Sequence, residues 1–214
     1  LCTIASNGRL PDSEVTGMIP NTRMTEIEYL EFERKSDIKH EFVNGRILAM
    51  SGAKRNHNVI AWNIGGELRN KLKGRDCEAY PSDMRVFVPG PRLYTYPDLV
   101  VVCGEPKFQD DVLDTLLNPV LLIEILSEST ESYDRGKKFQ QYRSIEGLKE
   151  YVLIAQDEAR IEKYVRHGDG FWRLSEAVGL DAEIVFESIE CPIHLREVYD
   201  KVDFEADEAI ETDS

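Results

Sequence analysis

The sequence predicts a single α+β (α/β) domain in which helices cover both faces of a β-sheet. Two short segments, "DLVVVCG" and "VLLIEIL", are apolar almost throughout, which is typical of strands buried on both faces. Between Asn58 and Leu72, apolar residues recur every four positions, and this spacing predicts a helix that packs on such a sheet. They are Ile60, Ile64, Leu68 and Leu72. A length of 214 residues suits one domain of this kind with a sizeable core.

The segment before that helix predicts a short helix and a hairpin. Thr25 and Glu28, three residues apart, have the pattern of a capping box, so we expect a helix that begins there and ends near Ser36. Asn44-Gly45 stands between two strand-like runs in "HEFVNGRILAM", and this dipeptide is the strongest short-range signal of a β-hairpin. Glu41 would then lie on the first strand of the hairpin.

Later segments predict further strands and two helices. The strands are expected in "MRVFV", "DLVVVCG", "VLLIEIL" and "EYVLI", with a loop from Gln109 to Asn118 before the third. "RIEKYVR" and "FWRLSEA" alternate like half-exposed strands around a turn at 167–170. Helices are expected from Tyr133 to Ser144 and from Pro192 to Tyr199.

Composition and charge indicate the limits of the domain along the chain and the compartment in which the protein is expected. We expect a flexible leader at 1–23, the domain at 24–201, and an acidic tail at 202–214 that holds six acids and no Lys or Arg. The net charge is −14 and the isoelectric point is about 4.8, the reverse of the basic surface expected of a nucleic-acid-binding protein. No apolar run approaches the roughly 18 residues of a membrane span, and a cytoplasmic protein is expected.

Four cysteines and two tryptophans have ordinary interpretations. The cysteines lie far apart, with no C-x-x-C pair, which argues against a zinc site and against a disulfide framework. A reducing cytoplasm fits this pattern, and Cys103 is expected to be a small buried hydrophobic residue. Trp62 and Trp172 are expected to be core or partly buried surface residues rather than stacking platforms, because tryptophan is highly buried on average.

The most informative residue is Glu124, an acid inside the apolar run from Val120 to Leu126. An ionised carboxylate removed from water is costly unless a cation or several hydrogen bonds meet it, so we expect a positive group to face Glu124. Asp98 stands at the start of the neighbouring buried strand, directly after Pro97. Two carboxylates, water and a substrate phosphate are a common ligand set of Mg²⁺. A strand-start Asp and a salt-bridged Glu are the ordinary alternative.

A lysine on the following helix is the candidate cation. Phe139 and Tyr142 are the expected packing residues of that helix, which puts Lys138 at the border of its buried stripe, within reach of Glu124. Alternatively, Asp134 and Lys138 form an ordinary i, i+4 ion pair on a helix surface, a pair that contributes only about 0.2–0.5 kcal/mol.

These residues resemble the PD-(D/E)XK nuclease superfamily, and in detail the Uma family of restriction-endonuclease-like proteins. The resemblance extends roughly from Thr25 to Val202 and rests on "KHEFVNGRILAMSG", "HNVIAWNI", "YPDLVVV", "LLIEILSEST", "YDRGKKFQQYR" and "LKEYVLI". It implies a restriction-endonuclease-like mixed β-sheet core flanked by helices, with a Mg²⁺ or Mn²⁺ ion on Asp98 and Glu124. An upstream acid of the family is best matched by Glu41.

The chain departs from the wider superfamily pattern at one position. That pattern has a lysine two residues after the glutamate, where this chain has Leu126. In the Uma branch the lysine is moved to the following helix, and the spacing to Tyr142 assigns it to Lys138, with Lys137 as the fallback. The resemblance therefore implies a catalytic set of Asp98, Glu124, Lys138 and Glu41.

The implied function is Mg²⁺-dependent hydrolysis of phosphodiester bonds in nucleic acid, with DNA as the expected substrate and a homodimer as a further expectation. Two alternatives stay open: a nuclease fold retained as a catalytically silent interaction module, and a metal-dependent hydrolase of small phosphoesters, which fits the acidic composition better. A basic cleft could still attract phosphate; its candidate residues are Arg69, Lys71, Lys73, Arg135, Lys137, Lys138 and Arg143. For His57 the ordinary reading, a residue at the start of its helix, is favoured over a role in the site.

Overall fold

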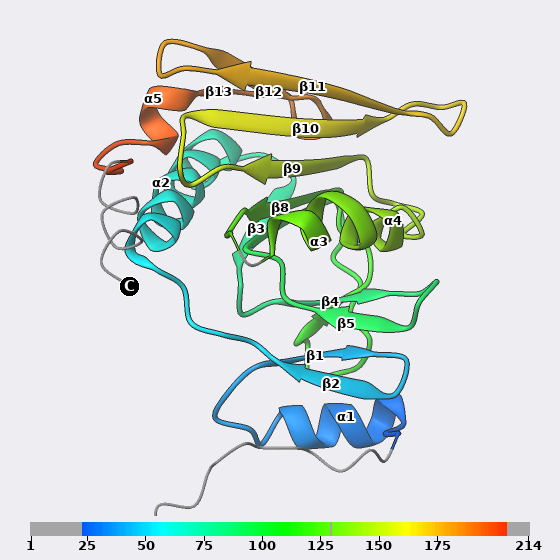
Figure 1. The fold of residues 1–214 in the computed structure, drawn as a ribbon. Coiled ribbons are helices and arrows are strands. Elements are labelled where there is room, and N and C mark those ends of the chain that lie inside the picture. Colours follow the sequence, from blue (N-terminus) through cyan, green and yellow to red (C-terminus); the bar gives the residue numbers. More distant parts are fainter. Residues whose placement is uncertain (1–22, 129, 205–214) are drawn as a thin grey trace, which may run out of the picture.

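A six-stranded sheet forms the centre of the molecule (Figure 1). The computed structural model describes residues 23–128 and 130–204. The strand order is β11-β10-β9-β8-β6-β3. The bounds are β3 Cys77–Pro81, β6 Leu99–Cys103, β8 Leu121–Ile125, β9 Glu150–Ile154, β10 Arg160–Arg166 and β11 Trp172–Val178. β8 and β9 are parallel, whereas β3 with β6 and β6 with β8 are antiparallel, so the sheet is mixed, as the family resemblance implies.

Two smaller sheets flank the central one. The first has the order β2-β1-β5-β4-β7 and lies below the central sheet in Figure 1, with α1 beneath it. Its elements are α1 Glu26–Glu33, β1 His40–Val43, β2 Arg46–Ala49, β4 Arg85–Val88, β5 Leu93–Thr95 and β7 Thr115–Leu116. The second is a hairpin of β12 Glu183–Phe186 and β13 Cys191–His194, followed by α5 Leu195–Val198.

Helices cover both faces of the central sheet, because both faces of β6 and β8 are apolar. α2, Arg55–Leu72, packs its buried stripe on the face that carries Leu121 and Ile123. The opposite face, which carries Leu122, packs against the segment 139–148. This segment begins in the last of three short turns: α3 Glu131–Tyr133, the π-helix η1 Asp134–Lys138, and α4 Phe139–Tyr142. Glu124 is two residues from Leu122 and therefore faces this second layer.

The local signals at the start of the domain are confirmed. Thr25 caps α1 and forms the full capping box with Glu28. Asn44 and Gly45 have φ angles of 46° and 89°, the left-handed conformations that a tight hairpin turn between β1 and β2 requires. The turn sets the register in which Glu41 lies opposite Leu48, so Glu41 lies on the first strand as expected.

Several boundaries differ from the sequence-based expectation. α2 begins at Arg55, three residues early. The strands β3 and β5 are additional: β3 is an edge strand with mixed polarity, and β5 has only three residues, so neither shows a clear period. The expected helix at 192–199 is wrong in its first half, because 191–194 pairs with β12. The helix expected at 133–144 contains the π-helical turn of η1.

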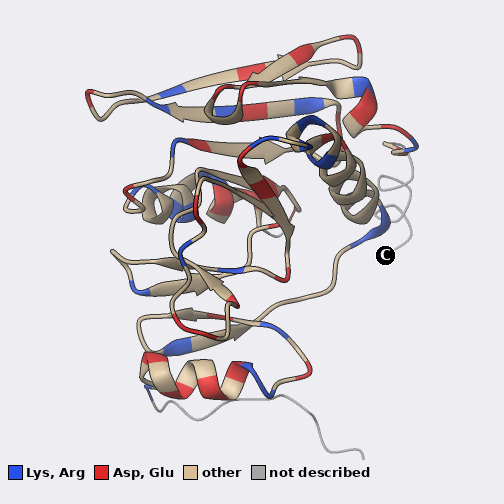
Figure 2. Ribbon diagram, turned by 180° about the vertical axis from the view of Figure 1, so that it is seen from behind, with Lys and Arg blue, Asp and Glu red and all other residues tan. Residues whose placement is uncertain are grey.

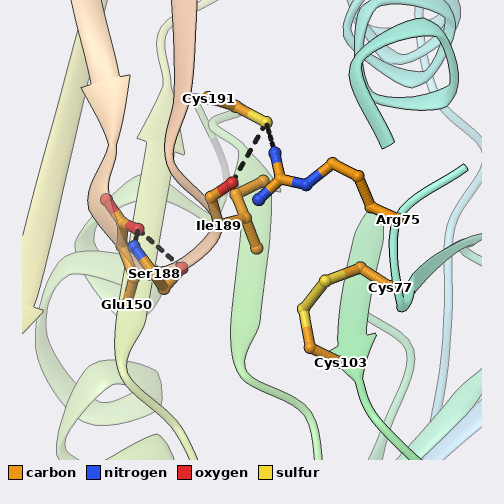
Figure 3. Close-up of a disulfide and its surroundings, with 7 residues drawn as sticks. All are labelled: Arg75, Cys77, Cys103, Glu150, Ser188, Ile189 and Cys191. Carbon is orange, nitrogen blue, oxygen red and sulfur yellow. Dashed lines mark hydrogen bonds between the residues drawn. A yellow bond between two sulfur atoms is a disulfide. The ribbon is translucent and has the colours of Figure 1, made fainter. Parts of the chain in front are cut away.

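The cysteine prediction is wrong, because Cys77 and Cys103 form a disulfide (Figure 3). The antiparallel register of β3 and β6 puts these two residues directly opposite each other, although 26 positions separate them in the sequence. Cys103 is therefore bonded, and its side chain is partly buried against the core. Cys191 is a free, buried cysteine whose sulfur contacts the guanidinium of Arg75.

The predicted leader and acidic tail fall almost entirely outside the described residues. Arg23 is the one described position of the leader, and 202–204 are those of the tail. Phe204 packs against the core beside α2, and the carbonyl of Asp203 accepts a hydrogen bond from the side chain of Asn56. Across the described residues, the structure contains no helix with the length and apolar character that crossing a membrane requires.

Candidate active site

Strand register brings the two predicted metal-binding carboxylates together. In the antiparallel pair β6–β8, Leu99 lies opposite Ile123, so the position before β6, Asp98, falls opposite Glu124. The carboxylate of Asp98 accepts a 2.7 Å hydrogen bond from the backbone N–H of Ile125. This bond ties the start of one strand to the end of the other, and it holds Asp98 beside Glu124 at one edge of the sheet.

Lys138 meets Glu124 from the helical layer. Its ammonium nitrogen lies 3.0 Å from Oε1 of Glu124, and both side chains are buried. A cation therefore does face the buried glutamate. Lys138 closes the π-helical turn that begins at Asp134, and π-helical turns inside helices are frequent at functional sites. Lys137, the alternative lysine, is exposed and lies outside this cluster.

Glu41 reaches the same ammonium from the flanking sheet. Its Oε1 lies 3.8 Å from Nζ of Lys138 and accepts a hydrogen bond from the hydroxyl of Thr95 on β5. The four residues that the sequence analysis proposed for catalysis, Asp98, Glu124, Lys138 and Glu41, thus line one cleft. Asp98 and Glu124 come from the central sheet, Glu41 from the flanking sheet, and Lys138 from the helical layer.

Two further side chains of the cluster were not assigned to the site from sequence. Asp134 is buried, with Oδ1 3.3 Å from the ammonium of Lys138, so this i, i+4 pair is not the surface ion pair considered above. The hydroxyl of Tyr142 donates a 2.7 Å hydrogen bond to Oε1 of Glu124. The spacing 134, 138, 142 on one helical face was the available signal, and Tyr142 was interpreted only as a packing residue.

The cluster carries more carboxylate charge than its single lysine can balance. Burial raises the pKa of Glu124 to about 8, with added repulsion from Asp134 and Asp98, although Lys138 opposes the change. Burial also raises the pKa of Asp134. Burial alone would lower the pKa of Lys138, but attraction to Glu124, Glu41 and Asp134 holds that pKa well above its usual range. Burial and mutual repulsion thus oppose ionisation of these carboxyl groups, whereas the same carboxylates favour the charged form of Lys138.

This excess of carboxylate charge fits a hard divalent cation. No cluster of three or more Asp, Glu, His or Cys side chains with metal-binding geometry occurs within 23–128 and 130–204. Mg²⁺ commonly binds through one or two carboxylates and completes its shell with water and substrate phosphate. Asp98 and Glu124 match this minimal set. Lys138 and Tyr142 both contact Oε1 of Glu124.

His57 belongs to the site, contrary to the favoured reading of its sequence position. It lies on the first turn of α2, and its Nε2 is 3.2 Å from Oδ1 of Asp98. Its Nδ1 is buried and has no hydrogen-bond partner among the described residues. The carboxylate of Asp98 thus lies between the imidazole of His57 on one oxygen and the backbone N–H of Ile125 on the other.

A cleft of about 1930 Å³ opens beside the cluster and is lined by β3, α2 and the residues above. Several basic side chains line its wall: Lys39, Lys54, Arg69 and Lys73. Figure 2 shows basic positions at both ends of α2. Of the cleft residues proposed from sequence, Arg69, Lys73 and Lys138 line it, whereas Lys71, Arg135, Lys137 and Arg143 do not. Arg135, for example, pairs with Glu131 and Glu162.

Sequence comparison relates this chain to a nuclease family. The profile of the family Uma2, described as "Putative restriction endonuclease", matches residues 27–194. Two uncharacterized proteins of Synechocystis sp. are similar to it. One is 40% identical over 163 residues, which are 76% of this chain and 92% of the relative. The other is 36% identical over 153 residues, which are 72% of this chain and 80% of the relative.

Structural comparison agrees on the fold. The crystal structure of a "putative nuclease belonging to DUF820" from Anabaena variabilis superimposes with a TM-score of 0.68. The match covers 82% of this chain and 97% of that protein at 18% sequence identity. The mixed sheet with flanking helices is therefore the fold of that protein.

Proposed function

We propose that this chain, which belongs to the Uma2 family of putative restriction endonucleases, is a metal-dependent endonuclease that hydrolyses phosphodiester bonds in nucleic acid. The observation that carries the proposal is the buried contact between Lys138 and Glu124, with Asp98 alongside and all three residues lining one large cleft. Family membership and the shared fold support a nuclease; the metal, the substrate and the roles of individual residues are our proposal.

Each residue of the cluster has a role in this proposal. Asp98 and Glu124 would hold Mg²⁺ or Mn²⁺, which when bound polarises a phosphoryl oxygen and lowers the pKa of a coordinated water. Lys138 would orient the attacking water and offset the negative charge that develops on the phosphate. Glu41 contacts the ammonium of Lys138 and would help to position it. Tyr142 holds the Glu124 carboxylate through its hydrogen bond.

The size of the cleft favours a polymer over a small phosphoester. Sites for small molecules usually measure about 300–1,000 Å³, and this cleft has a volume of about 1930 Å³. The basic side chains Lys54, Arg69 and Lys73 lie on the α2 wall of the cleft, whereas carboxylates, including those of the cluster, line much of the rest, so a polyanion would be held at the α2 wall.

Metal binding is the first test, because it needs no knowledge of the substrate. We expect calorimetric titration with Mn²⁺ to show a specific site in the wild type that is lost in Asp98→Ala and in Glu124→Gln. The exposed Glu105, which lies outside the cleft, provides the matched control, and Glu105→Gln should bind as the wild type does.

Cleavage of nucleic acid is the second test. Duplex DNA, single-stranded DNA, RNA and a mononucleotide ester should be incubated with Mg²⁺, with Mn²⁺ and with a chelator. We expect metal-dependent cleavage of at least one polymer, with the mononucleotide ester unchanged. If only the mononucleotide ester is hydrolysed, the enzyme is a small-phosphoester hydrolase. If no metal binds and nothing is cleaved, the cluster is a structural ion network in an interaction module.

A further inference from the structure

Trp62 is the most exposed large apolar side chain of the described residues. Its exposed fraction is 84%, so the expectation of a partly buried tryptophan is wrong. Single exposed apolar residues are common and need no explanation. Trp62 differs because it lies on the wall of the cleft that contains the acidic cluster, where it would meet whatever occupies that cleft.

The same face of α2 carries polar and basic side chains in line with Trp62. This face includes Asn58, four residues before Trp62, and Gly66 and Arg69, four and seven residues after it. Lys73 continues the same line just beyond the end of the helix. These intervals return to one side of a helix every turn. All five residues are exposed and line the cleft, whereas the stripe from Ile60 to Leu72 packs on the sheet. At 1.5 Å per residue, this face extends for roughly 22 Å.

The basic side chains of this face are available to a ligand. Lys71, on the neighbouring side of α2, pairs with Glu67 at 3.7 Å. Arg69 and Lys73, in contrast, form no ion pair with any residue of the described chain. A Cβ built on Gly66 would have no atom within 4 Å, so the space over the helix between Trp62 and Arg69 is open.

We propose that this face of α2 binds a single-stranded segment of nucleic acid, with a base stacked on Trp62 and the backbone phosphates held by Arg69 and Lys73. An aromatic platform beside a basic track is the combination that binds single strands without sequence preference. Stacking needs a base whose face is free, which an unpaired strand offers and an intact duplex does not. The inference rests on the proposed nuclease function and specifies its substrate as unpaired.

Tryptophan fluorescence tests this directly, because the chain contains only two tryptophans. In a Trp172→Phe background, Trp62 is the sole reporter. A short oligothymidylate, its RNA counterpart and a hairpin duplex should be titrated in the presence of a chelator, so that binding is measured without cleavage. We expect quenching by the single strands at concentrations several-fold below those needed for the duplex. Comparison of the affinities for the DNA and the RNA oligonucleotide shows whether deoxyribose or ribose is preferred.

Variants separate the aromatic contribution from the basic one. We expect Trp62→Ala, followed by polarisation of a labelled oligonucleotide, to weaken single-strand binding about 5- to 150-fold, the range found for base–aromatic stacking. Trp62→Phe should retain most of the affinity. Arg69→Ala and Lys73→Ala should each reduce the slope of log affinity against log salt by about 0.7. Phe171→Ala and Lys35→Ala alter exposed residues outside the cleft and should change neither quantity.

The outcomes distinguish this inference from the proposed function. Quenching and loss of binding in Trp62→Ala support the inference even if no cleavage is found with any metal. Metal-dependent cleavage with unchanged oligonucleotide binding in Trp62→Ala overturns the inference and leaves the nuclease intact. Equal binding of duplex and single strand, or absence of any quenching, also overturns it. So does self-association that depends on Trp62 in sedimentation experiments, because the face would then bind a second copy.

Discussion

The ammonium of Lys138 lies 3.0 Å from the carboxylate of Glu124 in the interior of the protein. The charges around this pair do not balance, because the carboxylates of Asp134 and Glu41 also lie close to the single ammonium of Lys138. A buried ion pair of this kind is weak support for stability, since desolvation offsets much of the attraction. Its position at the edge of a cleft is consistent with the metal and phosphate binding proposed above.

The two adjacent lysines should differ sharply in activity. We expect Lys138→Met to reduce metal-dependent cleavage at least about 100-fold, the lower range for loss of one group that stabilises transition-state charge. Lys137→Met is the matched control, because Lys137 is exposed, and it should cleave as the wild type does. Initial cleavage rates measure the effect, and circular dichroism checks that both variants fold. Loss of activity in Lys137→Met alone would contradict the assignment.

Glu124 should lower the stability of the protein as the pH rises. The pKa of Glu124 is raised to about 8 in the folded protein from an ordinary value of 4.5. Between these values the folded state holds a proton that the unfolded state has released, so the free energy of unfolding falls with rising pH. The slope from this one group is at most about 1.4 kcal/mol per pH unit.

The Glu124→Gln variant isolates this effect, because glutamine cannot titrate. We expect the free energy of unfolding of Glu124→Gln, relative to wild type, to increase between about pH 5 and pH 8 in urea titrations. Glu105→Gln serves as a surface control and should show no such trend. A pH-independent difference between Glu124→Gln and the wild type would show that Glu124 ionises normally in the folded protein.

Metal binding should release a proton and strengthen with pH. A divalent cation binds the ionised form of Glu124, whose pKa is raised to about 8 by burial. Below that pH, metal affinity should rise up to about tenfold per pH unit, and it should level off above it. Calorimetry in two buffers of different ionisation enthalpy measures the released proton. An affinity for Mn²⁺ that does not change between pH 6 and pH 8 would exclude Glu124 as a ligand that titrates in this range.

The disulfide should stabilise the protein only under oxidising conditions. Cys77 and Cys103 close a loop of 26 residues, for which restriction of the unfolded chain predicts about 3.5 kcal/mol. We expect Cys77→Ser to lower the free energy of unfolding by up to this amount without reductant and to match the wild type in its presence. Denaturant titrations measure both. A wild type that is unaffected by reductant would show that the bond does not form in solution.

Local patterns in the sequence determined much of the fold. The capping box at Thr25 and the Asn44-Gly45 turn were confirmed, because each depends on a few neighbouring residues. The apolar runs around β6 and β8 predicted buried strands, because a segment composed almost entirely of apolar residues is stable only when it is removed from water. The position of Glu124 in such a run also predicted a nearby cation, since burial of an unpaired carboxylate costs too much free energy.

Tertiary structure decided which residues meet. The register of β6 and β8 brought Asp98 opposite Glu124, and the register of β3 and β6 joined Cys77 to Cys103. Periodicity shows which side of an element is apolar, but pairing order and register depend on contacts between distant segments. The π-helical turn that buries Lys138 and the exposure of Trp62 in the cleft likewise follow from packing between layers, which no local pattern encodes.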